Sequence, residues 1–366
     1  MTVRLPFLLV LSLSLGAACS SAGSLQDSAG GARGGSAGSQ SGAGGGGGGT
    51  GGQSGAAGGG AGGAVPSALE ITGLAYGNGT FVAVGAERQN AALWTGVIYA
   101  SADGAAWTRV AGGLAGQPHD VKFGNGKFVT IESFFSDSGV YPPKALVSDD
   151  GRAWTTTGDL PDGVVAERIA FGAGTFVTGG RSSHLRSTDG VTWTPFGPAA
   201  SSYLASAVDF AGGRFVSWTK WENDVAVYDG SVWSSSALPD AKYMFDDLRV
   251  VNDRFVAVAR YDCCFGEQPS QIRWGTASSA DGSTWAFDQF ELTAAPSQIV
   301  HDSGTICIGF RDWDLLSGAT CDSLVVTFHD NNFRPEALLS AGGIFIASGI
   351  AGILTSSDGR VWTKRL

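Results

Sequence analysis

Charged and histidine side chains recur in the stretch just before a Gly-rich turn, at several points along the chain. Two carboxylates that face one cleft about 5 to 10 Å apart can hydrolyse a glycosidic bond. Asp120, Arg168 and Asp247 are therefore the candidate catalytic residues. The alternative, which we favour, is that the opposite charges pair with one another and have no catalytic role. The full set is His119, Asp120, Lys122, Glu167, Arg168, Asp209, Asp246, Asp247 and Arg249.

A second group combines aromatic rings with arginines and lies in five segments, 86–96, 132–144, 218–224, 260–273 and 310–322. Aromatic rings beside arginine suit the stacking of a sugar or a hot spot for protein binding. The alternative is that several of these rings only cover the ends of the sheets. The candidate ligand-binding residues are Arg88, Trp94, Tyr141, Trp221, Arg260, Tyr261, Arg273 and Trp313.

A repeated phrase indicates which elements position these residues. Ser-x-Asp-Gly-x-x-Trp begins at Ser101, Ser148, Ser187, Ser279 and Ser356, and a turn rich in Gly, Asn or Asp, followed by Phe and then Val or Ile, precedes each copy. Together with weaker copies, the phrases define seven units of about 40 to 50 residues, the size of a propeller blade. Two hairpin turns in each unit predict four strands. The sequence therefore predicts an all-β, seven-bladed β-propeller with four-stranded blades.

Two of the seven units depart from the phrase. In the fourth unit, Val227 replaces the Ser before Asp229, and the sixth unit decays to the stretch 327–333. The first strand begins near Ile71 and the last one covers 361–364. We therefore expect both terminal blades to be complete, with no strand shared between the two ends of the domain.

The repeated phrase resembles the Asp-box, or BNR repeat, of sialidase-like propellers, although each copy is one residue shorter than usual. The resemblance implies a turn between the third and fourth strands of each blade, with a structural role for its Asp and Trp. It also implies that ligands bind on the opposite face, where the second and third strands join. It does not imply sialidase activity, since the family's Arg-Ile-Pro signature is absent. The repeat residues are Asp103, Trp107, Asp150, Trp154, Asp189, Trp193, Asp229, Trp233, Asp281, Trp285, Asp358 and Trp362.

The first residues predict export. Arg4, an apolar run from Leu5 to Leu15 and small residues up to Ala18 are typical of a signal peptide, expected over 1–18. Cys19 follows, which resembles a bacterial lipoprotein signal and implies lipidation of Cys19 as the new N-terminus. Gly16 stands where that family usually has Leu, so an ordinary signal peptide cut near Ala18 is the alternative.

The segment 19–65 is almost wholly Gly, Ser and Ala, and it holds too little apolar area to fold. We expect a disordered linker there and a propeller over 66–366. A lipid on Cys19 would attach the protein to a membrane. We therefore expect a lipoprotein of the bacterial cell envelope, on the outer membrane or cell surface, or otherwise a secreted protein.

Four further cysteines agree with an oxidising compartment. Cys307 is expected on the second strand of unit six and Cys321 at the end of the loop that follows, so we favour a Cys307–Cys321 disulfide. Cys263 and Cys264 would then form a vicinal disulfide or remain two thiols. No His or Cys stands near them at the spacing of a metal site, so no metal is expected.

Composition narrows the function. A net charge of −10 argues against nucleic-acid binding, which needs a basic face. No cofactor is expected, and the propeller is expected to be a monomer. The leading hypothesis is a non-enzymatic module that binds a glycan or a protein on the face where the second and third strands join. The alternatives are a glycoside hydrolase of Asp-box type and a scaffold or assembly factor of the envelope.

Overall fold

The structure is a computed structural model, and it describes residues 68–90, 93–133, 142–161, 168–179, 184–197, 206–219, 224–238, 243–251, 253–262, 272–289, 296–302, 305–310, 314–318 and 325–366. All of them belong to the second of two compact units of the chain, Ala61–Leu366. Within these ranges, no helix is long and apolar enough to span a membrane. The predicted signal peptide, Cys19 and the linker lie outside the described ranges.

The described strands form seven groups of four, which we call blades one to seven in chain order. Blades one to four contain β1 (Leu69–Gly77), β2 (Thr80–Arg88), β3 (Trp94–Ser101), β4 (Thr108–Leu114), β5 (Gln117–Gly124), β6 (Lys127–Ser133), β7 (Lys144–Ser148), β8 (Thr155–Asp159), β9 (Ile169–Gly172), β10 (Thr175–Thr178), β11 (Leu185–Ser187), β12 (Thr194–Pro195), β13 (Ser206–Ala211), β14 (Arg214–Thr219), β15 (Asp224–Tyr228) and β16 (Trp233–Ala237). Blades five to seven contain β17 (Tyr243–Val251), β18 (Arg254–Asp262), β19 (Ile272–Ser279), β20 (Ala286–Gln289), β21 (Pro296–Asp302), β22 (Thr305–Phe310), β23 (Asp314–Gly318), β24 (Val325–His329), β25 (Arg334–Ala341), β26 (Ile344–Ile350), β27 (Gly352–Ser356) and β28 (Thr363–Lys364).

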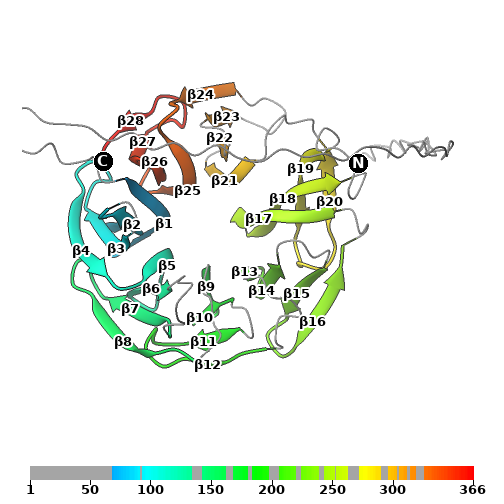
Figure 1. Ribbon diagram of the computed structural model, residues 1–366. Helices are drawn as coiled ribbons and strands as arrows, with labels where there is room; N and C mark the ends of the chain where they lie inside the picture. The colour runs from blue at the N-terminus through cyan, green and yellow to red at the C-terminus, as the bar shows by residue number, and fades with distance from the viewer. Residues whose placement is uncertain are drawn as a thin grey trace, which may run out of the picture. The chain divides into compact units, whose positions relative to one another are not determined.

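The blades are arranged in a ring around a central axis (Figure 1). In each blade, neighbouring strands pair antiparallel, and the first strand lies nearest the axis. Each first strand contacts the first strand of the next blade, and β25 contacts β1 to close the ring. The prediction of an all-β, seven-bladed propeller with four-stranded blades is confirmed.

Blades one and seven meet where the ring closes. Each takes its four strands from one continuous segment, as predicted, and a single bridge joins Glu70 of β1 to Ile350 of β26. The N–H of Ala351 donates to the carbonyl of Leu69 at 2.7 Å. Arg334 lies 3.5 Å from the Glu70 carboxylate. Backbone bonds and an ion pair, rather than an exchanged strand, therefore join the two terminal blades.

An aromatic residue on the first strand of a blade covers a glycine of the blade before it. A Cβ added to Gly77 would lie 2.1 Å from the Phe123 ring, and one added to Gly172 would lie 2.0 Å from the Phe210 ring. Gly124 meets the next blade's aromatic ring in the same way. These rings also pack within their own blades, with centroids 4.7 Å apart for Phe210 and its partner on β14. Only glycine leaves room for this contact, which explains the aromatic-glycine pair in the repeat.

The Ser-x-Asp-Gly turn, our name for the turn that each copy of the phrase forms, joins the third and fourth strands of a blade. Asp103 Oδ1 accepts backbone N–H groups from the residues two and three positions later, each at 2.8 Å. Ser101 Oγ accepts the N–H of Gly104 at 2.9 Å, and Trp107 Nε1 donates to the carbonyl of Gly104 at 2.8 Å. The paired carboxylate bonds recur at Asp150, Asp189, Asp229, Asp281 and Asp358. Asp and Trp therefore brace the turn, the predicted structural role.

These bonds predict a loss of stability in acid. Donation by the Thr284 N–H is the main cause that lowers the pKa of Asp281 to about 2, from an ordinary value of 3.8. Between these two values the unfolded chain binds the proton more readily, so stability should fall as pH falls through this window. Thermal unfolding of the wild type and Asp281→Asn from pH 6 to pH 2 would measure this. We expect the wild type to be more stable at pH 6 and the two curves to converge near pH 2; a constant gap would contradict the prediction.

Blade six differs from the prediction. Its third strand, β23, lies inside the segment 310–322 that was expected to be a loop. The decayed phrase at 327–333 covers the end of β24 and the link to β25, so it comes after the fourth strand instead of before it. Cys321 therefore follows the third strand in the sequence instead of closing the loop before it. The Cys307–Cys321 disulfide stays a prediction, since Cys321 lies outside the described ranges.

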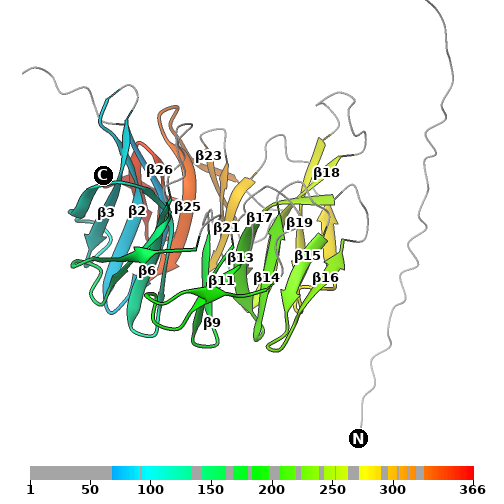
Figure 2. The same ribbon diagram turned by 60° about the horizontal axis from the view of Figure 1, so that its bottom comes forward.

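The other four predicted loops are also shorter than expected, because the strands on either side extend into them. The longest extensions are in blades one and five, where β2 and β18 each have nine residues, against four for β10 of blade three. Figure 2 shows the ring from the side, with the hairpin end of β18 at its upper edge.

Turns of neighbouring blades bind one another on one face of the ring. Asn78, between β1 and β2, donates to the carbonyls of Gly126 and Asp149 in blade two, at 3.3 and 2.9 Å. Asn125 makes the equivalent pair of bonds to blade three. This face carries the Ser-x-Asp-Gly turns and is held together by side chains. The hairpin ends of β2 and β3, and of their equivalents, lie at the opposite ends of the strands.

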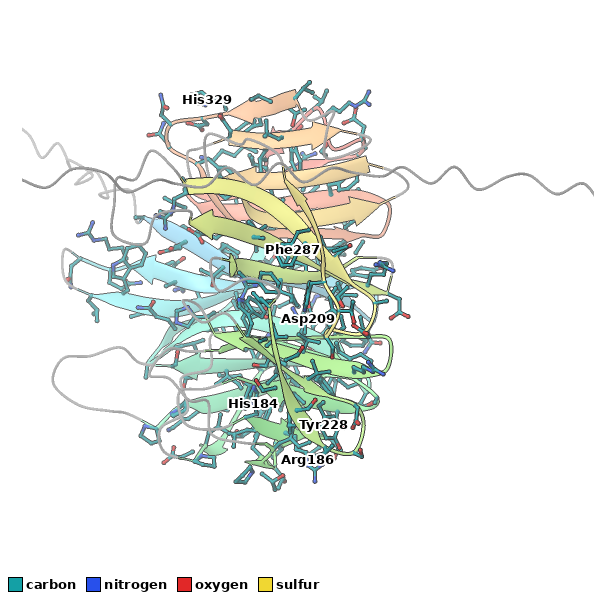
Figure 3. All side chains as sticks on the ribbon, turned by 90° about the vertical axis from the view of Figure 1, so that its right-hand side faces the viewer. His184, Arg186, Asp209, Tyr228, Phe287 and His329 are labelled. Carbon is teal, nitrogen blue, oxygen red and sulfur yellow. The ribbon has the colours of Figure 1, made fainter. Side chains whose placement is uncertain are left out.

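An aromatic ring of blade four stacks on a histidine of blade three at the junction of these two blades. Trp233 stacks on His184 with ring centroids 4.6 Å apart, and His184 Nε2 lies 2.7 Å from Ser217 Oγ. His184 is 2% exposed. His184 and Tyr228 of β15 are labelled in Figure 3, and the Tyr228 ring lies 5.5 Å from that of Trp233. His184 thus joins two blades.

Candidate functional site

The first strands of the blades enclose a central cavity of about 290 Å³. Its charged lining consists of three cations and two carboxylates from blades two to five. Blades one and seven complete it with backbone and mostly apolar side chains. The lining residues are Thr72, Gly73, Leu74, Asp120, Lys122, Arg168, Asp209, Arg249, Val250, Ala337, Leu338, Leu339 and Ser340.

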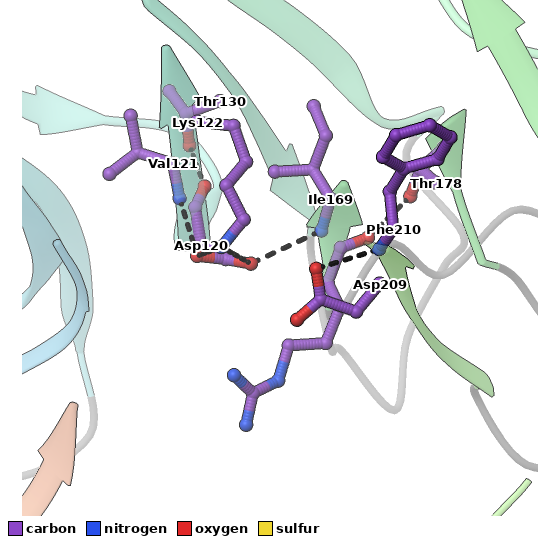
Figure 4. A network of polar contacts seen from close by, with 9 residues as sticks. Asp120, Val121, Lys122, Thr130, Ile169, Thr178, Asp209 and Phe210 are labelled. Atoms are coloured by element: carbon purple, nitrogen blue, oxygen red, sulfur yellow. Dashed lines mark hydrogen bonds and ion pairs between the residues drawn. The ribbon is translucent and has the colours of Figure 1, made fainter. Parts of the chain in front are cut away.

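Asp120 lies on β5 and links blade two to blade three (Figure 4). Its carboxylate accepts the N–H of Ile169 at 3.2 Å and lies 3.2 Å from Lys122 Nζ. Asp120 is only 7% exposed. Burial raises its pKa, but Lys122, Arg168 and Arg249 outweigh burial and hold the pKa below its ordinary value. Asp120 is therefore an ionised carboxylate whose bonds are largely used within the fold.

Asp209 lies on β13 and has the opposite tendency. Its Oδ1 accepts the N–H of Phe210 at 2.9 Å (Figure 4). Burial raises the pKa of Asp209 above its ordinary value, although Lys122 and Arg249 oppose the shift. The cavity thus holds one carboxyl group whose pKa lies below its ordinary value and one whose pKa lies above it. A pair with separated pKa values can divide acid and base roles in catalysis.

The charge balance of the cavity also suits binding. Lys122, Arg168 and Arg249 bring three positive charges against the two carboxylates of Asp120 and Asp209, so the described lining is positive overall. A cavity of this kind attracts an anionic group on a ligand. Burial and the charge of Arg168 lower the pKa of His119, so this histidine favours its neutral form and adds no further positive charge.

The structure brings two of the three catalytic candidates to this cavity, Asp120 and Arg168. Asp247 belongs to β17, opposite Val258, but its side chain lies outside the described part of the structure, as does that of Asp246. Glu167 is likewise outside it. Asp209 joins the cavity although it was not chosen as a catalytic candidate; its position before a Gly-rich turn was the available signal.

The ligand-binding candidates divide into three groups. Arg88 and Trp94 pair across the end of the β2–β3 hairpin, with Arg88 exposed. Tyr261 and Arg273 pair across the end of the β18–β19 hairpin, next to Arg260, although their side chains are not described. The remaining candidates lie outside the described ranges and are Tyr141, Trp221 and Trp313.

The cysteines give no further information about a site. Cys307 belongs to β22, but its side chain is not described, and Cys263, Cys264 and Cys321 lie outside the described ranges. The described residues include no cluster of three or more His, Cys, Asp or Glu side chains able to hold a metal ion.

Fold and cavity together define a β-propeller with a charged central cavity. No family model matches the sequence, and no curated protein matches it. Among solved structures, YCF48 bound to D1 peptide is similar, with a TM-score of 0.59 at 12% identity, over 79% of this chain and 92% of that one. A GH74 xyloglucanase from Xanthomonas campestris gives 0.57 at 13% identity, over 81% of this chain and 54% of that one. This chain thus spans about half of the xyloglucanase, and likeness at such identities shows the fold alone.

Proposed function

We propose that this protein is an exported, lipid-anchored propeller that binds a segment of another protein without chemical turnover. The observation that carries the proposal is the positive central cavity, in which Asp120 is already bonded to Lys122 and Ile169. Three cations against two carboxylates, one of which is already bonded within the fold, favour holding an anionic group over attacking a substrate. The structure of YCF48 with a D1 peptide gives one example of a propeller with a peptide ligand.

The cellular part of the proposal rests on sequence. Cys19 would carry the lipid and 19–65 would be a linker, which together would place the propeller at the outer membrane or cell surface. We also assign the Ser-x-Asp-Gly turns to the Asp-box type. The assignment is supported by the turn's place between the third and fourth strands and by its carboxylate bonds.

One observation favours a second function, glycoside hydrolysis. Asp209 with its raised pKa would be the acid, and Asp120 with its lowered pKa would be the ionised partner. A glycan would then be the substrate rather than a ligand.

The two functions are distinguished by screening the full-length protein on peptide and glycan arrays and by following the hits with mass spectrometry. We expect retention of a peptide with an acidic group and no product. Arg249→Ala should weaken binding by about tenfold or more, because it removes a charged partner from a buried site. Product from a glycan that disappears in Asp209→Asn and Asp120→Asn would instead establish the hydrolase. A peptide bound equally well by wild type and Arg249→Ala would contradict the cavity as the site.

A further inference from the structure

A second pocket, of about 480 Å³, lies between the end of blade one and blade two, apart from the central cavity. It is formed by the link from β4 to β5, the end of β6, the start of β7 and the end of β8. These are the ends of β6 and β7 that point away from the Ser-x-Asp-Gly turn at 148–154. The lining residues are Ala115, Gly116, Glu132, Ser133, Pro142, Lys144 and Asp159.

The charges in this second pocket do not balance. Glu132 is opposite Lys144 across β6 and β7, and Lys144 is opposite Asp159 across β7 and β8. The Lys144 ammonium pairs with Asp159 at 3.6 Å. One cation therefore stands between two carboxylates and is bound to the outer one, which leaves the pocket with one net negative charge.

Glu132 carries that excess charge at a buried position. The residue is 8% exposed, and its Oε2 accepts the N–H of Gly116 at 3.3 Å, the one bond that the described structure gives it. A carboxylate can accept about four hydrogen bonds, and burial of a charge is costly unless it is paired. The remaining oxygen positions of Glu132 are therefore suited to a cationic donor.

Glu132 lies on the face of β6 that is turned towards blade one, the face to which Phe128 also belongs. A guanidinium group presents several N–H donors in one plane, so it can bond to both oxygens of one carboxylate. An ammonium group lacks this planar fork.

We propose that the second pocket binds the guanidinium group of an arginine side chain from a protein ligand, with the carboxylate of Glu132 as its acceptor. Ala115, Gly116 and Pro142 supply apolar surface for the methylene stem. The inference rests on the proposed protein-binding function and defines one chemical feature of the ligand: an arginine, in addition to the anionic group that the central cavity attracts.

The probes are acetyl-Gly-Arg-Gly-amide and the same peptide with citrulline, a neutral near-isostere, titrated into the full-length protein by calorimetry. We expect the arginine peptide to bind with a Kd of about 1 mM or tighter, and the citrulline peptide to bind about tenfold more weakly or worse. Glu132→Gln, which keeps an acceptor for Gly116, should abolish this preference. Lys144→Met should strengthen it, because a competing cation is removed.

Asp149→Asn is the matched control, since Asp149 is an exposed acid that pairs with Lys127 at 2.6 Å on the other side of blade two. It should leave the preference unchanged. Equal binding of both peptides to the wild type, or a preference that survives Glu132→Gln, would overturn the proposal. If wild type and Glu132→Gln hold an array ligand equally well, this inference fails and the proposed function stands. If the arginine peptide is preferred but no array ligand is found, the proposed function fails and the arginine pocket stands.

Discussion

Gly172→Ala should destabilise the propeller by about 1 to 3 kcal/mol, the cost of overpacking a well-packed contact. The added Cβ would lie 2.0 to 2.4 Å from three atoms of the Phe210 ring, so either the ring or the blade must move. Gly172 lies outside the positive-φ region, so the cost arises from space alone. Chemical denaturation of wild type and variant measures it.

Gly158→Ala is the matched control, because a Cβ at Gly158 would meet nothing within 4 Å. We expect no loss of stability there. The interface between blades four and five suggests a second substitution that restores stability. There Ala211 takes the place of the glycine and Val250 takes the place of Phe210, and both pack in the same cluster. Phe210→Val should therefore recover part of the loss in Gly172→Ala. Equal losses at Gly158 and Gly172 would contradict the model of a ring packed on glycine.

Asp120→Ala should cost about 3 to 5 kcal/mol, the usual effect of removing one partner of a buried ion pair. The substitution removes the acceptor for Lys122 and for the Ile169 N–H, and so weakens the junction of blades two and three. Urea unfolding at pH 7 measures this loss. A loss below about 1 kcal/mol, the range of exposed ion pairs, would show that the pair is not buried in solution.

Asp209→Asn is the contrasting variant, because Asn resembles the protonated acid that this site prefers. The raised pKa means that the folded protein holds its proton more readily than the unfolded chain, so ionisation lowers stability as pH rises above the ordinary value of 3.8. We expect Asp209→Asn to be as stable as the wild type at pH 4 and equal or more stable at pH 7. A marked loss at pH 7 would mean that the Asp209 charge stabilises the fold.

The residues of the central cavity could be predicted in part from the sequence, but their pKa shifts could not. The sequence singled out Asp120 and Arg168, because both come just before a Gly-rich turn. It could not predict that burial and the surrounding cations shift the pKa values of Asp120 and Asp209 in opposite directions. Those shifts depend on distances between blades that are far apart in the chain.

The second pocket was missed for a different reason. Glu132 and Lys144 were treated as the ends of a loop, whereas both are paired strand residues. Alternation of charge along three adjacent strands is visible only once the register is known. The packing of Phe210 on Gly172 did have a signal in the sequence. The units whose first strand ends in aromatic-Gly are followed by a unit with an aromatic residue at that position, whereas the unit with Phe-Ala is followed by one with Val250.

The sequence by itself determined the seven-unit ring, the four strands of each blade and the structural role of the Ser-x-Asp-Gly turn. These features follow from local turn chemistry and from a period that repeats along the chain. The tertiary structure decided which charges share the central cavity, where the third strand of blade six lies and which carboxylate is left unbalanced between blades one and two. These depend on strand register and on contacts between blades, which no local pattern encodes.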